Sequence, residues 1–302
     1  MATSRRNFLT TATFTGLSLP LFYQNLFANL LYQDGSYTMT PLRRSVGFFT
    51  ERGGTIGWMI SDNGIVIVDT QFPDQARHLI KEVQNRSDRK IDLLINTHHH
   101  GDHTSGNIAF KGLTGVILAH ENSKKNQMRV AKERNQEEGQ LYPNTTFSTE
   151  WSGKVGEEPV KLRYFGPGHT NGDVIIHFEN SNIVHIGDLI FNRRHPFVDK
   201  SAGASMENWI RILERTQKTF DSDTKFIFGH AGEGYNVTGS MDDIKAMENF
   251  LSKVIDTVKT ALKAGKRKED IMKINSIKGA DEWKGDGIQR SLSAALEEFS
   301  KE

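Results

Sequence analysis

The chain has 302 residues, of which 36% are hydrophobic and 25% are charged, and its formal net charge is +1. These proportions are those of a soluble globular protein and argue against disorder. The balance of acidic and basic side chains gives no basic excess of the kind that nucleic-acid-binding proteins carry, so no nucleic-acid partner is expected. The sequence contains no cysteine, which excludes disulfides, thiolate metal ligands and cysteine nucleophiles.

The first 28 residues contain no Asp, Glu or Lys, and their only charged side chains are Arg5 and Arg6. The run from Ser4 to Leu9 leads into an apolar stretch and resembles a twin-arginine export signal. The resemblance implies a signal peptide over residues 1–30, passage of the folded protein through the twin-arginine translocase, and a periplasmic location. The main domain is therefore predicted over 36–302. No later apolar run approaches the ~18 residues of a membrane helix, so no membrane span is expected after removal of the leader.

From residue 45 onward, short apolar runs that predict strands alternate with longer periodic segments that predict helices. In chain order we predict strands over 46–50, 55–61 and 65–69, a helix over 72–86, strands over 91–96 and 115–119, a helix over 121–136, strands over 160–165, 174–178 and 183–186, a helix over 206–220, and a strand over 225–228. Helices over 242–264, 268–273 and 288–299 then make residues 239–302 a helical C-terminal extension. The pattern predicts a mixed α/β fold in one domain.

Four of the eleven histidines fall within six residues. They are His98, His99, His100 and His103, and Asp102 lies among them. The cluster follows a predicted buried strand and includes a glycine, and a strand that ends in such a tight loop can aim several side chains at one point. Imidazole and carboxylate are ligands that zinc or iron prefers, whereas Mg²⁺ and Ca²⁺ favour oxygen ligands alone. The cluster therefore indicates a metal site.

Three later residues of metal-binding type stand just past predicted apolar strands. They are His169, Asp188 and His230. With four residues of the first cluster they make seven potential ligands, which is too many for one tetrahedral ion and suited to two. We therefore expect a site for two metal ions at one edge of the strands.

The ordered set His98-x-His100-x-Asp102-His103, followed by His169, Asp188 and His230, resembles the metallo-β-lactamase-fold hydrolase superfamily. The resemblance implies an αββα four-layer sandwich with the metals between the sheet edges. It also implies a distribution of the ligands: His98, His100 and His169 on one ion, Asp102, His103 and His230 on the other, and Asp188 as a bridge. Asp69 matches an aspartate that supports the ligands in this family, although the cap of a helix or turn stays open as an alternative. His99 falls between motif positions and is not expected to be a ligand.

The resemblance further implies two Zn²⁺ per chain, with iron or manganese as alternatives. A hydroxide bridging the ions would attack a small-molecule substrate at an ester, thioester, lactone or β-lactam type bond, and Asp102 would orient the nucleophile and carry a proton. Two other functions stay open. One is a mononuclear iron dioxygenase of the same fold, and the other is a non-catalytic metal-binding protein. The intact His100 favours hydrolysis, because the di-iron electron-transfer relatives of this superfamily usually have glutamate at the corresponding position.

Two segments are expected to wall the substrate pocket, because loops at the metal edge of a rigid scaffold carry specificity. One is the turn at 50–54, and the other is the segment 191–200 with Arg193, Arg194, His195 and Phe197. A guanidinium in the second segment could hold a substrate carboxylate through paired hydrogen bonds. The alternative is that these arginines are solvated or brace the helical extension.

Overall fold

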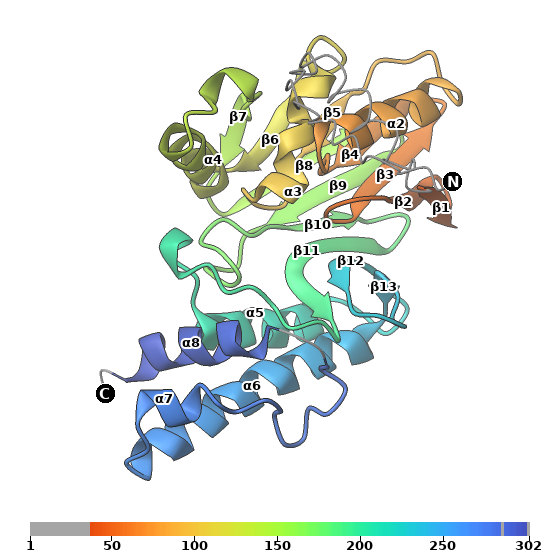
Figure 1. Ribbon diagram of the computed structural model, residues 1–302. Helices are drawn as coiled ribbons and strands as arrows, with labels where there is room; N and C mark the ends of the chain where they lie inside the picture. The colour runs from red at the N-terminus through yellow and green to blue at the C-terminus, as the bar shows by residue number, and fades with distance from the viewer. Residues whose placement is uncertain (1–36, 285–286, 301–302) are drawn as a thin grey trace, which may run out of the picture. The chain divides into compact units, whose positions relative to one another are not determined.

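Two β-sheets form the framework of the computed structural model, which describes residues 37–284 and 287–300 (Figure 1). The predicted export signal lies outside the described residues. The first sheet has seven strands in sequential order: β1 (Thr38–Arg43), β2 (Val46–Thr50), β3 (Ile56–Ser61), β4 (Gly64–Val68), β5 (Leu93–Ile95), β6 (Ile117–His120) and β7 (Thr145–Phe147). Strands β1 to β4 pair antiparallel, and β4 to β7 pair parallel.

The second sheet has six strands. Their spatial order is β13 (Thr238–Gly239), β12 (Lys225–Ala231), β11 (Ile183–Asn192), β10 (Ile175–Phe178), β9 (Glu158–Arg163) and β8 (Glu150–Val155). Strands β11 and β12 pair parallel, and the other pairs are antiparallel.

Helices cover the outer face of each sheet. Those of the first half are α2 (Pro73–Gln84), α3 (Gly101–Thr104), η1 (Ser105–Phe110), α4 (Glu121–Glu133) and η2 (Glu137–Gly139). Those of the second half are η3 (Lys200–Ala202), α5 (Met206–Thr219), α6 (Met241–Lys263), α7 (Lys268–Ile271) and α8 (Ile288–Phe299). Helix α6 begins with a capping box between Ser240 and Asp243, which satisfies backbone N–H groups of its first turn. Within the described ranges, no helix combines the length and the apolar character needed to cross a membrane.

Three hydrophobic clusters separate the layers. Successive residues of β4 point to opposite faces, so that Val66 packs with Phe178 between the two sheets while Ile67 packs with Leu79 of α2. The third cluster joins the second sheet to α5, α6 and α8 and includes Phe250. The result is the predicted αββα sandwich with a helical C-terminal extension.

Four strands were not predicted from the sequence. They are β1, β7, β8 and β13, and each lies at the edge of its sheet. All four carry side chains that are half-buried or exposed along their whole length. An edge strand that buries little of either face produces no apolar run, so the pattern that identifies interior strands is absent from these segments.

Strand β11 is longer than predicted and continues from Ile183 through Asp188 to Asn192, and β12 continues through His230. These two residues therefore lie within strands rather than just beyond them. The pairing of β11 with β12 shifts register on both sides of Gly187, which has a φ of +54°. This left-handed backbone conformation suits glycine and bends the strand immediately before Asp188.

Candidate metal centre

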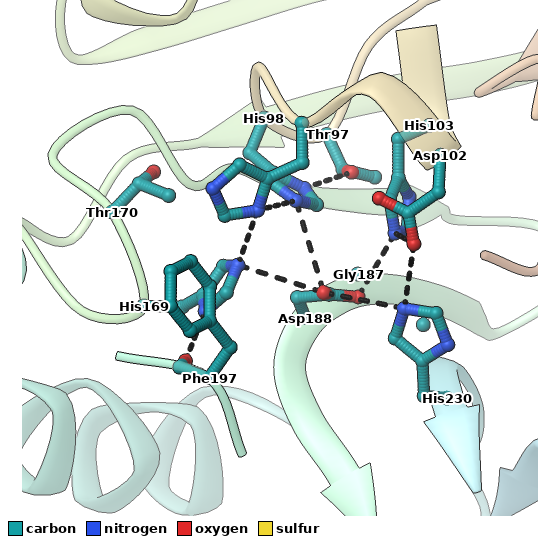
Figure 2. A network of polar contacts seen from close by, with 12 residues as sticks. Thr97, His98, Asp102, His103, His169, Thr170, Gly187, Asp188, Phe197 and His230 are labelled. Atoms are coloured by element: carbon teal, nitrogen blue, oxygen red, sulfur yellow. Dashed lines mark hydrogen bonds and ion pairs between the residues drawn. The ribbon is translucent and has the colours of Figure 1, made fainter. Parts of the chain in front are cut away.

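The seven predicted ligands come from five separate segments and converge at one edge of the sheets. Figure 2 labels all of them except His100. His98 and His100 lie in the loop after β5, Asp102 and His103 in α3, His169 in the loop after β9, Asp188 in β11 and His230 in β12. The structure thus brings together every residue of the predicted set.

Four of these side chains surround one point, which we call position 1. The Nδ1 atom of His100 lies 3.1 Å from Nε2 of His98 and 2.9 Å from Nε2 of His169. The Oδ2 atom of Asp188 lies 3.8 Å from the same nitrogen of His98 and 3.5 Å from that of His169. Position 1 is therefore bounded by three imidazole nitrogens and one carboxylate oxygen.

The second point, position 2, lies on the other side of Asp188. Oδ1 of Asp188 is 3.1 Å from Nε2 of His103, and Oδ2 is 3.4 Å from Nε2 of His230. Oδ2 of Asp102 is 3.2 Å from Nε2 of His230 and 3.8 Å from Nε2 of His103. Asp188 thus faces both positions, as expected of a bridging ligand.

The outer nitrogens of the position 1 histidines are all paired. His100 Nε2 lies 2.8 Å from Oδ2 of Asp199, and His169 Nδ1 lies 2.6 Å from the carbonyl oxygen of Phe197. His98 Nδ1 lies 2.9 Å from Oγ1 of Thr97, a hydroxyl that itself donates to Asp69. Because each outer nitrogen faces an acceptor, each inner nitrogen presents a lone pair. Three lone pairs that converge on one point fit a cation.

The atoms at position 2 fit a cation as well. His103 Nε2 and Asp188 Oδ1 are buried and have no hydrogen-bond partner, although they lie 3.1 Å apart. Buried polar atoms of this kind are costly when unpaired and call for a missing partner. The donor set is nitrogen and carboxylate oxygen without sulfur, which suits zinc, iron or manganese.

Asp69 lies directly behind position 2. It is fully buried, has a φ of +66°, and accepts hydrogen bonds from the backbone and hydroxyl of Thr97. Its Oδ2 is also 2.8 Å from Nδ1 of His103. Thr97 and His103 belong to a segment distant in sequence from Asp69. Asp69 therefore supports the segment that carries the candidate ligands His98 to His103, rather than capping a local turn.

Four of the ligand histidines fall into two classes, because burial lowers the pKa of two of them and neighbouring carboxylates raise the pKa of the other two. Burial holds the pKa of His98 well below its ordinary value, and burial together with the neighbouring His100 lowers the pKa of His169 to about 3. At position 2 burial alone would lower the pKa values, but the carboxylates outweigh it. Asp188 and Asp102 thereby raise the pKa of His103 well above its ordinary value and that of His230 to about 9.

Two glycines allow backbone to approach the donor atoms closely. A Cβ on Gly54 would lie 2.2 Å from Nε2 of His103, and a Cβ on Gly229 would lie 1.8 Å from Oδ1 of Asp188. The Gly54 N–H also donates to the carbonyl of Asp102 at 3.0 Å. The predicted wall at 50–54 is thus fixed to α3 at Gly54.

The predicted pocket residues Arg193, Arg194 and His195 point in different directions. Arg193 pairs with Asp243 at 2.5 Å and Glu282 at 3.1 Å, which is the bracing contact with the helical extension that the sequence left open as an alternative. Arg194 places a guanidinium nitrogen 3.4 Å from Nδ1 of His230.

His195 is buried, with its ring 5.6 Å from that of Phe250 in α6. It therefore packs in the helical layer, and we find no pocket-facing contact for it among the described residues. The left-handed conformation of Arg193, with a φ of +54°, precedes this change of direction.

Two supporting groups had no assigned role at the sequence level: the carboxylate of Asp199 and the carbonyl of Phe197. Both lie in the segment 191–200, which was predicted to wall the pocket, but nothing in the spacing indicates that they face ligands. His99 is not among the donors of positions 1 and 2. Its Nε2 lies 3.5 Å from Oδ2 of Asp199, and His99, His100 and Asp199 form a separate group of possible ligands.

Comparison with known proteins gives consistent matches. The family model described as "Metallo-beta-lactamase superfamily" matches residues 50–250. The chain is 24% identical over 199 residues to the metallo-beta-lactamase type 2 of Elizabethkingia meningoseptica, a match that covers 66% of this chain and 76% of that protein. It is 30% identical over 165 residues to the 2,4-dinitroanisole O-demethylase subunit alpha of Nocardioides sp. (strain JS1661), covering 52% of this chain and 48% of that subunit.

Solved structures agree on the fold. A metallo-beta-lactamase from Pontibacter korlensis matches with a TM-score of 0.58 and 18% identity, over 72% of this chain and 99% of that one. A double mutant of the sec-alkyl sulfatase PisA1 matches with a TM-score of 0.69 and 12% identity, over 91% of this chain and 54% of that one. At these identities the likeness concerns the fold.

Proposed function

Since the chain belongs to the metallo-beta-lactamase superfamily, we propose that it is a hydrolase that binds two zinc ions and cleaves an ester, thioester, lactone or β-lactam type bond in a small molecule. The observation that carries the proposal is the position of Asp188. Its carboxylate faces three histidines on one side and a second group of His103, His230 and Asp102 on the other. A carboxylate shared in this way supports two adjacent ions rather than one.

When bound, two divalent ions supply a water of lowered pKa and polarise the bond under attack. The chain contributes the orientation of the reacting water. Asp102 is the most exposed of the seven ligand side chains, at 33%. Burial alone would raise the pKa of its carboxyl group, but the neighbouring His103 and His230 outweigh burial and lower that pKa to about 2. An ionised carboxylate at the open side of the site is able to orient a water and to receive its proton.

The similar proteins differ in their activities, which are those of a lactamase, an O-demethylase and an alkyl sulfatase. The bond class therefore has to be found by assay. We expect elemental analysis of the purified protein to find two zinc ions per chain, and zinc loading to activate hydrolysis of at least one of nitrocefin, a thioester, a lactone and an aryl ester. Stoichiometric iron with a coloured spectrum would favour the iron dioxygenase instead.

We also propose that residues 1–30 direct export to the periplasm, because Arg5 and Arg6 stand where a twin-arginine signal requires its pair. Replacement of both arginines by lysine keeps the charge of the segment but should retain the protein in the cytoplasmic fraction. Export of the doubly substituted chain at the normal level would contradict this proposal.

A further inference from the structure

A large apolar side chain stands exposed beside position 1. Phe197 is 43% exposed, and its ring centroid lies 5.5 Å from the ring of His100 and 6.1 Å from that of His169. Figure 2 shows its ring beside His169. Single exposed apolar residues are common on protein surfaces, so exposure alone implies nothing. The notable feature is that this ring flanks two of the residues that bound position 1.

The backbone around Phe197 is tied to the metal centre. Its carbonyl oxygen lies 2.6 Å from Nδ1 of His169, and two residues later the N–H of Asp199 donates to the carbonyl of His169 at 3.1 Å. Pro196 and Val198, on either side, are buried. The segment therefore holds the backbone of Phe197 at a fixed place relative to position 1, and the side chain faces solvent.

The rim beside position 2 is different. A cavity of about 740 Å³ is lined there by residues that follow β11 and β12 and by residues of the C-terminal extension, among them Arg194, Glu233 and Lys284. These side chains are charged and exposed. Tyr235, which is 41% exposed, lines the same cavity, so charged groups and an aromatic ring occur together beyond position 2. Beside position 1 the exposed large side chain is the apolar ring of Phe197.

We propose that Phe197 is a specificity-determining residue, which selects substrates that carry an apolar alkyl or aryl group next to the bond under attack, on the side of position 1. The inference rests on the proposed function, since it takes the metal centre as the place where substrate binds. Contact between the ring and an apolar group removes the exposed surface of both from water. One or a few carbons in such a contact discriminate between substrates by roughly tenfold or more.

The test uses two ligands with the same metal-binding head, acetohydroxamic acid and benzohydroxamic acid, and isothermal titration of the zinc-loaded full-length protein. The wild type should prefer the benzoyl compound, and Phe197→Ala should lose roughly tenfold of that preference. Phe197→Leu should keep most of it. The quantity compared is the ratio of the two dissociation constants in the variant, divided by the same ratio in the wild type. The different acidities of the two hydroxamic acids affect both proteins equally and therefore cancel.

Phe197→Ala is expected to fold and to bind zinc normally, because His169 uses the backbone oxygen of residue 197 and not its side chain. Met128→Ala is the matched control, since Met128 is 48% exposed but lies on α4. An unchanged preference in Phe197→Ala with normal zinc content would overturn the role of Phe197. Failure of the zinc-loaded wild type to hydrolyse any ester, thioester, lactone or β-lactam would instead contradict the proposed hydrolase, and the binding preference would still report on Phe197.

Discussion

The two metal positions share Asp188 but differ in how the protein supports them. At position 1 the outer nitrogens of all three histidines have fixed partners, and the only ligand side chain with appreciable exposure is His100, at 17%. At position 2 the side chain of Asp102 is 33% exposed, and the outer nitrogen of His103 faces the buried carboxylate of Asp69. The outer nitrogen of His230 lies 3.4 Å from the guanidinium of Arg194 instead.

The difference in charge is equally clear. Without metal, burial keeps His98 and His169 neutral, whereas Asp188 and Asp102 keep His103 and His230 protonated. Position 1 is therefore ready to accept a cation, and position 2 has to release protons first. One shared carboxylate therefore joins a position where His98 and His169 are already neutral to a position where His103 and His230 must first lose a proton.

Removal of the shared ligand should have the largest effect. Asp188→Ala takes a carboxylate oxygen from both positions and leaves a void in β11. We expect zinc content to fall below one ion per chain and the hydrolysis rate to fall by roughly a thousandfold, about 4 kcal/mol of transition-state stabilisation. Elemental analysis and kinetics under zinc saturation measure the two effects. A variant that keeps both ions would show that Asp188 is not the bridge.

Selective substitutions separate the two positions. His100→Ala should weaken binding at position 1 and Asp102→Ala at position 2, and each should lower the rate by more than roughly tenfold, about 1.4 kcal/mol. Replacement of zinc by cobalt measures the occupancy of each position, because the two ligand sets differ and should give cobalt different visible absorption spectra. His177→Gln is the control, since His177 lies in β10 against Phe220 and should change stability more than the rate. Equal loss at both positions from either substitution would remove the distinction between them.

The candidate ligands could be predicted from the sequence because histidine and aspartate are recognisable as metal-binding residue types. A histidine cluster directly after an apolar strand can be read from the sequence, and so can Asp69 at the end of another strand. The groups behind the ligands are not visible in this way. Asp199 lies 99 residues from His100 in the chain, and the carbonyl of Phe197 belongs to a backbone that every residue possesses.

The fold also has parts that the sequence predicts and parts that it does not. Interior strands such as β4 have an apolar pattern and were predicted, whereas the edge strand β8, with alternating half-buried and exposed residues, was not. The direction of the His195 side chain could not be predicted from the sequence either. It depends on the left-handed conformation of Arg193 two residues earlier, which is fixed by tertiary contacts to Asp243 and Glu282.

The supporting carboxylates should have smaller effects than the ligands. Asp199→Asn keeps the size of the side chain but weakens the acceptor for His100, so zinc affinity at position 1 should fall by about tenfold to a hundredfold. Asp69→Asn should act in the same range at position 2 through His103. Competition with a chromogenic chelator measures both. Asp221→Asn serves as control, because Asp221 pairs with Asn182 and Thr224 instead. If both substitutions weakened the same position, the assignment of one support to each would be wrong.

A change of pH should separate the two positions without any substitution. In the metal-free protein the pKa of His230 is raised to about 9, so below that pH a metal ion at position 2 must displace its proton. Affinity there should fall by about tenfold for each pH unit per proton displaced as the pH drops from 8 to 6. The pKa of His169 is lowered to about 3, so at position 1 this residue is already neutral and affinity should stay nearly constant in the same range. Titration calorimetry in buffers of different ionisation enthalpy counts the protons released by the first and the second ion. Equal proton release by both ions would mean that the carboxylates of position 2 do not hold its histidines in the charged form, and the contrast between the two positions would then lie in their supports alone.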